Sequence, residues 1–139
     1  MRQERHTLEV SSRGRGLVPF GASVSDWLGS IHAQDGLLTL FLQHTSASLL
    51  IQENADPDVL ADMDRFFEKL VKDGDPMFRH VAEGPDDMPS HVRAALTQTS
   101  LSIPIAGGKM TLGTWQGLYL YEHRHRGHTR RVVLHYLGQ

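Results

Sequence analysis

The chain has 139 residues, of which 40% are hydrophobic and 22% charged, an ordinary balance for one globular domain over residues 1–139. It contains no cysteine, which excludes disulfides, thiolate metal sites and cysteine nucleophiles, and its formal net charge of −2 argues against nucleic acid as a partner. No apolar run approaches the roughly 18 residues that span a bilayer, and the first residues lack the apolar centre of a signal peptide, so we expect no membrane partner and a cytoplasmic location.

The N-terminal third predicts two short strands, a short helix and a long apolar strand. The strands cover residues 5–12 and 16–20 around a glycine-rich, hairpin-like turn. A short capped helix over residues 23–28 follows, with these apolar residues on one face: Val24, Trp27, Leu28 and Ile31. Residues 37–43 are strongly apolar, which favours a central strand covered on both faces and ending at His44.

A polar stretch from His44 to Asp58 separates this strand from the next helix. It holds one imidazole, three hydroxyls, two amides and several carboxylates beside structure that should be buried, so we interpret it as half of a site. Residues 46–52 within it read as a further strand. Asp56 as N-cap and Pro57 at the first helical position then predict a helix start. That helix carries an apolar stripe: Val59, Leu60, Met63, Phe66, Phe67 and Leu70.

Residues 72–90 have no periodicity and are rich in Gly, Pro and Asp, and a loop of this length in a compact domain is usually functional or disordered. We expect a second principal helix to start at Pro89, with His91 in its first turn. Asp86 and Asp87 would lie near the N-terminus of that helix, where negative charge is favourable. Three apolar residues are expected to face inward: Val92, Ala95 and Leu96.

The last third predicts strands joined by short turns. Residues 99–105 form one strand, in which Pro104 suggests an edge position, and residues 110–122 form the longest strand. Two glycines flank Trp115 in that strand, which indicates a bulge or a close backbone approach. A closing strand covers residues 131–137. Together these elements predict an α+β fold with a largely antiparallel sheet and two principal helices.

Four histidines fall at element boundaries: His44, His80, His91 and His123. Ligands contributed by separate elements suit a catalytic metal site, where three protein groups hold the ion and leave one position open. A single boundary histidine is more often a hydrogen-bonded structural residue, but four of them favour a shared site for a divalent metal, zinc or magnesium. The alternative is that protonated imidazoles bind a phosphate directly.

Further polar residues near these histidines are candidates for roles in the same site. His44, Glu53 and Glu122 are the expected catalytic residues, the carboxylates acting as a base or orienting an imidazole. Four residues are expected to bind phosphate: Thr45, Ser46, Asn54 and Arg124. Basic side chains are dense over residues 124–131, yet such a run is more often a solvated face, and we expect no role for His125 and His128.

Four motifs in this order, HTSASLLIQENADPDV, GDPMFRH, EGPDDMPSHV and GTWQGLYLYEHR, closely resemble the YjbQ family, formerly the uncharacterised group UPF0047. The resemblance covers nearly the whole chain and is strongest over residues 36–135. It implies an α+β fold with a mixed, mainly antiparallel sheet, assembled as a homotrimer. It also implies a weak thiamine-phosphate synthase (transferase) activity, which joins a pyrimidine pyrophosphate to a thiazole phosphate and releases pyrophosphate.

Two other functions fit the same residues. One is a metal-assisted phosphohydrolase that acts on small phosphorylated metabolites, which an assay of phosphate release over a panel of substrates would identify. The other is a non-catalytic trimeric protein that binds an anionic metabolite, which tight ligand retention without turnover would indicate. In all three cases the expected partner is a small phosphorylated or anionic metabolite.

Overall fold

Two antiparallel sheets form the body of the molecule, and the computed structural model describes every residue from 1 to 139. The larger sheet has five strands in the order β1 (Arg2–Ser11), β8 (Thr129–Gly138), β3 (Gly36–Leu42), β5 (Ser100–Ala106) and β6 (Lys109–Met110). The smaller sheet has three strands in the order β2 (Gly16–Pro19), β7 (Gln116–Glu122) and β4 (Ala47–Glu53). The α+β class is confirmed, and every strand pairing is antiparallel.

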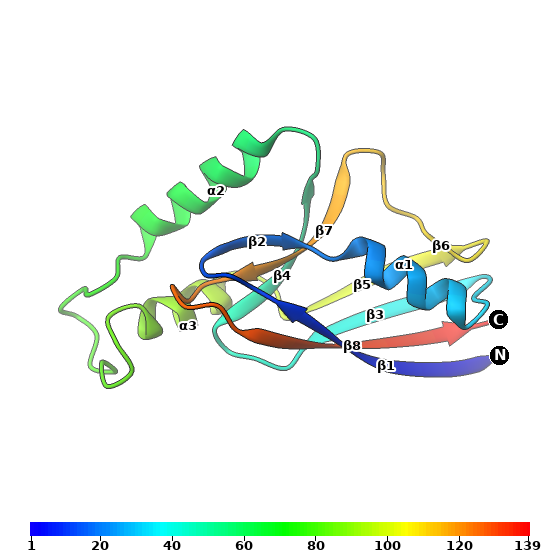
Figure 1. Cartoon of the computed structure of the whole chain (residues 1–139), viewed down its shortest axis with the longest axis horizontal. Helices are drawn as coiled ribbons and strands as arrows, with labels where there is room; N and C mark the ends of the chain where they lie inside the picture. Colours follow the sequence, from blue (N-terminus) through cyan, green and yellow to red (C-terminus); the bar gives the residue numbers. More distant parts are fainter.

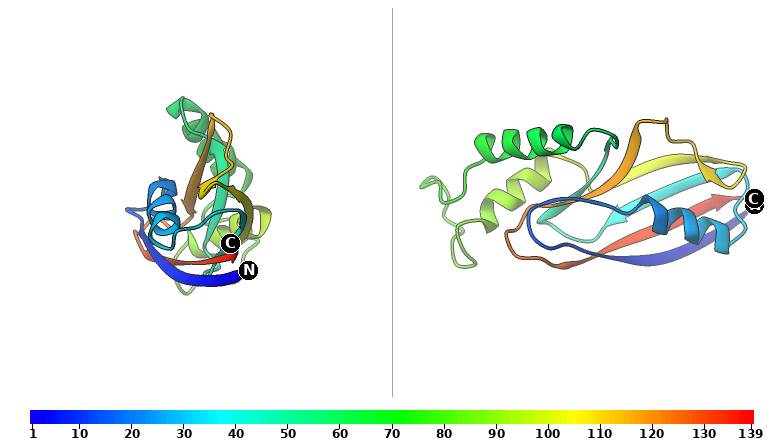
Figure 2. Two further views of the ribbon diagram at one scale, coloured as in Figure 1. Left: turned by 90° about the vertical axis from the view of Figure 1, so that its right-hand side faces the viewer. Right: turned by 45° about the horizontal axis from the view of Figure 1, so that its top comes forward.

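Three helices complete the fold: α1 (Gly21–Ser30), α2 (Pro57–Leu70) and α3 (Asp87–Leu96). Figure 1 shows α2 and α3 together at the end of the molecule that lies away from both chain termini. The second view in Figure 2 shows the same separation, with α1 at the opposite end beside the larger sheet. None of the helices combines the length and the apolar character that crossing a bilayer requires.

The hydrophobic core is built from alternate residues of the strands together with one face of α1. β5 shows this alternation over its whole length, because Leu101, Ile103 and Ile105 are buried while the residues between them are exposed. Val24 and Leu28 of α1 are fully buried in the same core, as their spacing predicted. However, α1 is ten residues long and equals α3 in length, so the prediction of only two principal helices is wrong.

The central position predicted for residues 37–43 is confirmed, since β3 pairs with both β8 and β5. The expectation that both faces of this strand are covered is wrong for the single chain. Leu37 and Phe41 point away from the core and are 42% and 49% exposed. Leu137, which is paired directly with Leu37 on β8, is 40% exposed. These three residues form an open apolar stripe on the outer face of the larger sheet, which the paired Thr39 and His135 interrupt.

The hairpin predicted for the N-terminal strands is wrong. β1 pairs with β8 in the larger sheet, whereas β2 pairs with β7 in the smaller one. The glycine-rich segment between them passes from one sheet to the other, and Gly14 adopts a φ of 135° there. A Cβ atom on Gly14 would lie 2.6 Å from the carbonyl oxygen of His125, so glycine permits a close approach of two loops.

The single long strand predicted over residues 110–122 is also wrong. The chain pairs briefly in β6, leaves the larger sheet, and enters the smaller sheet as β7 only at Gln116. The glycine-flanked Trp115 lies in this irregular connection and is 64% exposed, so it is not a core residue. The edge position suggested by Pro104 fits most of β5, because β6 pairs only with Ile105 and Ala106.

The bounds predicted for α2 are confirmed. The side chain of Asp56 accepts a hydrogen bond from the amide of Asp58 at 2.9 Å, and Pro57 occupies the first turn. Its apolar stripe is less buried than expected, since Phe66 and Leu70 are 62% and 56% exposed. Two acids that lie off this stripe form ion pairs with Arg15, which precedes β2: Asp64 and Glu68.

The interior side of α3 differs most from the sequence prediction. The helix begins at Asp87, two residues before Pro89, and the residues that it buries include Asp87, Ser90 and Arg93. Leu96, expected to face inward, is 57% exposed. The buried polar groups have partners on other elements; for example, Ser90 Oγ donates to the carbonyl of His123 at 2.8 Å. A polar helix face thus covers the end of the smaller sheet.

Candidate metal site

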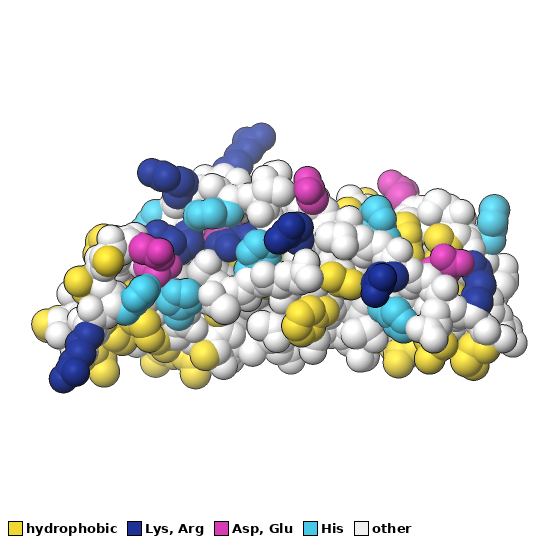
Figure 3. All heavy atoms as spheres, turned by 90° about the horizontal axis from the view of Figure 1, so that it is seen from below, with side chains coloured by type: hydrophobic (Ala, Val, Ile, Leu, Met, Phe, Trp, Pro, Cys, Tyr) yellow, Lys and Arg dark blue, Asp and Glu magenta, His cyan; other side chains and the backbone are white.

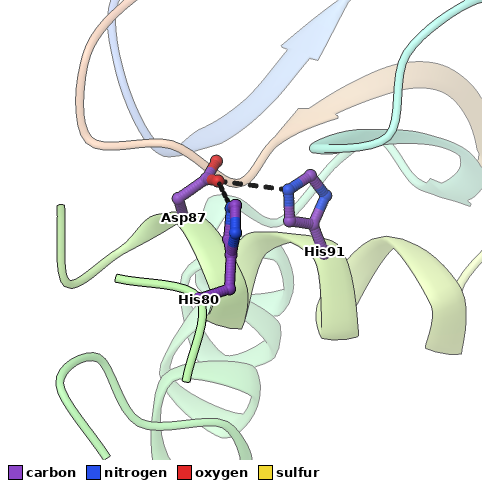
Figure 4. Close-up of side chains that lie close together, drawn as sticks. All are labelled: His80, Asp87 and His91. Carbon is purple, nitrogen blue, oxygen red and sulfur yellow. Dashed lines mark hydrogen bonds and ion pairs between the residues drawn. The ribbon is translucent and has the colours of Figure 1, made fainter. Parts of the chain in front are cut away.

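A cluster of His80, Asp87 and His91 lies at the N-terminal end of α3 (Figure 4). One ligand-type atom from each residue lies within 4.8 Å of the other two. His80 Nε2 is 2.6 Å from Asp87 Oδ2, and His91 Nε2 is 3.2 Å from the same oxygen. The carboxylate is almost fully buried, while the side chains of His80 and His91 are 47% and 31% exposed, so the cluster opens to solvent on its imidazole side.

Local structure explains how these three residues meet. Asp87 and His91 are four residues apart on α3, a spacing that places both side chains on one face of a helix. His80 comes from the long loop that precedes α3, as Figure 4 shows. That loop is closed by a hydrogen bond from the amide of Gly74 to the carbonyl of Pro85 at 3.0 Å. His80 is therefore brought back onto the start of the helix that carries the other two groups.

Both ring nitrogens of His91 face oxygen atoms. Nδ1 is 2.8 Å from the backbone carbonyl of Thr45, which can only accept a hydrogen bond, so Nδ1 carries a proton. In the neutral imidazole Nε2 then has a lone pair, and it points at the carboxylate of Asp87. This arrangement is favourable only if His91 is protonated or if a cation lies between Nε2 and Oδ2.

Arg124 holds the other side of Asp87. Its Nη1 donates to Asp87 Oδ1 at 2.8 Å and its Nε donates to Asp86 Oδ2 at 3.0 Å. Burial alone would raise the pKa of Asp87, but the hydrogen bond with His80 and the nearby positive charges lower it below its usual range. Asp87 is thus held as a carboxylate that turns Oδ2 toward the two histidines.

Two imidazoles and one carboxylate suit a divalent transition ion. Zinc takes His nitrogen and Asp oxygen at about 2.0–2.2 Å, and tetrahedral ligands at that radius lie about 3.4 Å apart. The separations of 2.6 and 3.2 Å in the cluster require only small side-chain adjustments to reach that value. Thr45 and Arg124 supply the outer contacts that metal-binding histidines and carboxylates usually have.

His44 lies outside this cluster. It follows β3 and precedes Thr45, but its ring contacts β8: Nε2 accepts the amide of Arg131 at 2.9 Å. Burial, reinforced by the positive charges of Arg130 and Arg131, lowers the pKa of His44. The ring is consequently a neutral acceptor that ties the chain after β3 to the neighbouring strand β8, and its Nε2 is already used.

His123 also lies outside the cluster and is completely buried. Its Nε2 is 2.9 Å from Ser48 Oγ, and its ring packs against Tyr121 with 4.3 Å between centroids. Burial, with the positive charges of Arg93 and Arg130, lowers the pKa of His123 to about 3. β7 ends at Glu122, so His123 and His125 lie beyond it and do not share a strand face.

Glu122 forms a buried ion pair with Arg130. Arg130 Nε donates to Oε1 at 2.9 Å and Nη2 donates to Oε2 at 2.5 Å, a two-pronged contact between fully or nearly fully buried groups. Ser12 Oγ donates to the same carboxylate at 2.6 Å. Arg130 Nη2 also donates to Ser46 Oγ at 2.9 Å. These buried contacts connect the ends of β1 and β8 in the larger sheet to the ends of β4 and β7 in the smaller sheet.

Glu53 and Asn54 lie at the far end of β4 from His44. Ala47 and Glu53 are six positions apart in extended chain, which is roughly 20 Å. Glu53 Oε2 accepts the amides of Ala55 and Asp56 at 3.0 and 2.8 Å, and thereby supports the turn into α2. The polar stretch that we interpreted as half of a single site is divided by β4 within one chain.

The four residues expected to bind phosphate differ in their exposure and in the hydrogen bonds that they already make. Thr45 is exposed, whereas Ser46 is buried under Arg130. Asn54 Nδ2 donates to the carbonyls of Thr114 and Gln116. Arg124 is bonded through three nitrogens, to Asp86, to Asp87 and to the carbonyl of Glu83. Figure 3 views the molecule from below the orientation of Figure 1. Histidines and Lys or Arg side chains gather there on the half that contains α3.

The sequence prediction missed Asp87 as a candidate metal ligand and misjudged Arg130. The signal for Asp87 was its i, i+4 spacing to His91, which was hidden because we expected the helix to start at Pro89. Arg130 is buried rather than solvated, while Arg126 and Arg131 are exposed as expected. His125 is exposed and its Nε2 lies 2.5 Å from Asp73 Oδ2, outside the cluster.

The fold and the cluster together define an α+β protein with a candidate site of two histidines and one aspartate. The chain belongs to the family described as UPF0047 protein YjbQ-like, whose family model matches residues 6–139. It is 48% identical to the UPF0047 protein sll1880 of Synechocystis sp., over 99% of this chain and 94% of that protein. It is 41% identical to the UPF0047 protein YjbQ of Salmonella typhimurium, over 97% of this chain and 98% of that protein.

Solved structures show the same fold. The conserved hypothetical protein TT1486 of Thermus thermophilus superposes with a TM-score of 0.86 at 31% identity, over 95% of this chain and 99% of that one. The hypothetical protein APE1520 of Aeropyrum pernix gives a TM-score of 0.85 at 29% identity, with both chains covered completely. The family resemblance stated from the sequence motifs is therefore confirmed.

Proposed function

We propose that His80, Asp87 and His91 bind a divalent metal ion and that the protein is a metal-assisted enzyme acting on a small phosphorylated metabolite. The observation that carries the proposal is the pair of oxygens facing His91. With Nδ1 donating to Thr45, a metal ion is the group that allows Nε2 and the carboxylate of Asp87 to face one another while His91 stays neutral. Three protein ligands leave one position open for water or substrate.

The donor set favours zinc or a similar transition ion over magnesium. Imidazole nitrogen binds zinc well, whereas magnesium prefers oxygen ligands and keeps several waters. When bound, such an ion would polarise a phosphoryl oxygen or neutralise a pyrophosphate leaving group. Asp87 and the two histidines hold it, Arg124 fixes the carboxylate, and Thr45 fixes the tautomer of His91. Thr45 is exposed and its carbonyl borders the cluster, so its hydroxyl is the group that we expect to meet a phosphate oxygen.

Within this class, the particular reaction that we propose is the one implied by the family resemblance, a weak joining of a pyrimidine pyrophosphate to a thiazole phosphate. The expected compartment is the cytoplasm. Ionised phosphorylated metabolites do not cross the hydrocarbon core of a membrane, so an enzyme that uses them works in the compartment where they are made. The test is a coupled assay of pyrophosphate release with both substrates, before and after zinc removal by a chelator and after zinc is added back. Metal-dependent pyrophosphate release that needs both substrates supports the reaction.

The same assay separates the alternatives. Release of inorganic phosphate from single phosphorylated substrates would replace the synthase reaction by a phosphohydrolase. Retention of a phosphorylated ligand without turnover would indicate a binding protein. If neither turnover nor binding of any phosphorylated compound depends on the metal, the proposed function is wrong.

We also propose that the chain assembles as a homotrimer. The support is the outer face of the larger sheet, where Leu37, Phe41 and Leu137 form an exposed apolar stripe on adjacent strands. Exposed apolar side chains on neighbouring strands of a sheet commonly mark a protein interface. A partner chain seated on this stripe would cover β3 on its second face, which accounts for the nearly continuous apolar sequence of that strand.

A further inference from the structure

A small pocket adjoins the candidate metal site on the side of His80. It lies within the loop that leads to α3, and its cavity volume is about 290 Å³. Most of its wall is apolar, formed by Pro76, Phe78, Val81, Met88 and Pro89, and His80 forms part of the same wall. One imidazole therefore belongs both to the metal cluster and to an apolar pocket.

Hydrogen bonds within the loop hold the pocket open. Gly74, with a φ of 71°, donates its amide to the carbonyl of Pro85 at 3.0 Å and joins the two ends of the loop. Asp75 accepts the amide of Met77 through its side chain at 2.9 Å and the amide of Phe78 through its carbonyl at 3.1 Å. Since the prolines in the wall also have restricted backbones, the pocket is formed before any ligand binds.

We propose that this pocket binds the apolar part of the substrate whose polar end sits at the metal. The inference rests on the proposed metal site. A pocket of about 290 Å³ is at the small end for ligand sites and suits one ring or a short branched chain. Because Val81 is 62% exposed at its edge, a ligand can reach the pocket without unfolding the loop. The substrate is thus a compound with a metal-binding head and a compact apolar substituent.

Two hydroxamates test this directly, because they present the same metal-binding group with different substituents. Acetohydroxamate carries a methyl group and benzohydroxamate a phenyl ring. We expect benzohydroxamate to bind the zinc-loaded protein about ten-fold or more tightly by isothermal titration calorimetry, since burial of a phenyl ring in an apolar pocket is worth at least that factor.

Two matched variants test whether the preference for benzohydroxamate arises in this pocket. Val81→Trp fills the pocket from its exposed edge, so the preference for benzohydroxamate should be lost while acetohydroxamate affinity is kept. Met77→Trp is the control, because Met77 is 74% exposed in the same loop and is not part of the pocket wall. Equal affinities of the two hydroxamates for the wild type, or an unchanged preference in Val81→Trp, overturn the pocket assignment. Absence of bound zinc by metal analysis overturns the metal site, and the pocket inference with it.

Discussion

Arg124 and Asp87 form an ion pair at 2.8 Å that fixes which carboxylate oxygen faces His80 and His91. Arg124 lies beyond the end of β7 and Asp87 begins α3, so the pair also joins the smaller sheet to that helix. The guanidinium holds Oδ1, and Oδ2 is left to the histidines. A hydrogen bond from a neighbouring residue to a metal-binding carboxylate normally changes the affinity of the site for the ion.

Replacing this arginine should therefore weaken metal binding. Arg124→Gln removes the charge that orients Asp87, and we expect zinc affinity to fall about 10- to 100-fold in a competition titration with a coloured chelator. Arg126→Gln, at an exposed arginine two residues away, is the control and should leave the affinity unchanged. Equal zinc affinity in the wild type and Arg124→Gln would show that the ion pair has no part in a metal site.

His123 should make stability depend on pH. Its pKa is about 3 in the folded protein against 6.5 for the free side chain, so below pH 6.5 the unfolded chain takes up a proton that the folded chain does not. The contribution of His123 is complete above pH 6.5 and falls by up to about 1.4 kcal/mol per pH unit as the pH drops toward 3. Between pH 7.5 and 5.0 this amounts to about 2 kcal/mol.

Urea denaturation at the two pH values measures this dependence. His123→Gln should lose less stability than the wild type on acidification, because its side chain does not titrate. His6→Gln, at an exposed histidine on β1, controls for the general effect of removing an imidazole. The same loss of stability in His123→Gln and the wild type would assign the acid sensitivity to other groups.

Glu122 is expected to act on stability rather than on chemistry. It is completely buried and its partner is Arg130, so Glu122→Gln leaves a buried guanidinium without its counter-charge. Breaking such a pair typically lowers the free energy of unfolding by about 3–5 kcal/mol. Glu53→Gln should have a smaller effect, about 1 kcal/mol, because it only weakens a helix-entry turn. A folded Glu122→Gln variant of normal stability with no activity would instead restore a catalytic role.

The apolar stripe of the larger sheet predicts the effect of a charge on assembly. Phe41→Asp places a carboxylate where we propose a subunit contact, so the mass measured by light scattering after size exclusion should fall from that of a trimer to that of a monomer. Phe66→Asp, on the exposed side of α2, is the matched control and should not change the mass. A wild-type protein that is already monomeric would contradict the trimer proposal.

Elements governed by local signals were predictable from the sequence. The start of α2 follows from Asp56 and Pro57, because capping and a preset φ act within one turn. The central position of β3 follows from its apolar run, which only Thr39 interrupts. The connection around Trp115 was not predictable in this way, since its alternating pattern fits a strand and only pairing with two different sheets interrupts it.

The site was predictable only in part, because its geometry depends on polar groups that meet across the fold. His80 and His91 were identified from their places at element boundaries, and the structure brings them together. His44 and His123 have equally suggestive positions, but neighbouring arginines and burial turn them into neutral structural groups. The alternation of Val132, Leu134 and Tyr136 along β8 places Arg130 on the buried face and Arg131 on the exposed one, but the sequence does not show that Glu122 is the partner of Arg130.

The most direct test of the metal site is the metal bound per chain, measured by mass spectrometry on protein purified without chelators, with anomalous diffraction at the zinc edge to place it. We predict about one zinc ion per chain in the wild type and an anomalous peak between His80, Asp87 and His91. His91→Ala should lose the ion, whereas His125→Ala should keep it. A metal-free wild type after incubation with zinc, or an anomalous peak elsewhere with none at these three residues, would contradict the account.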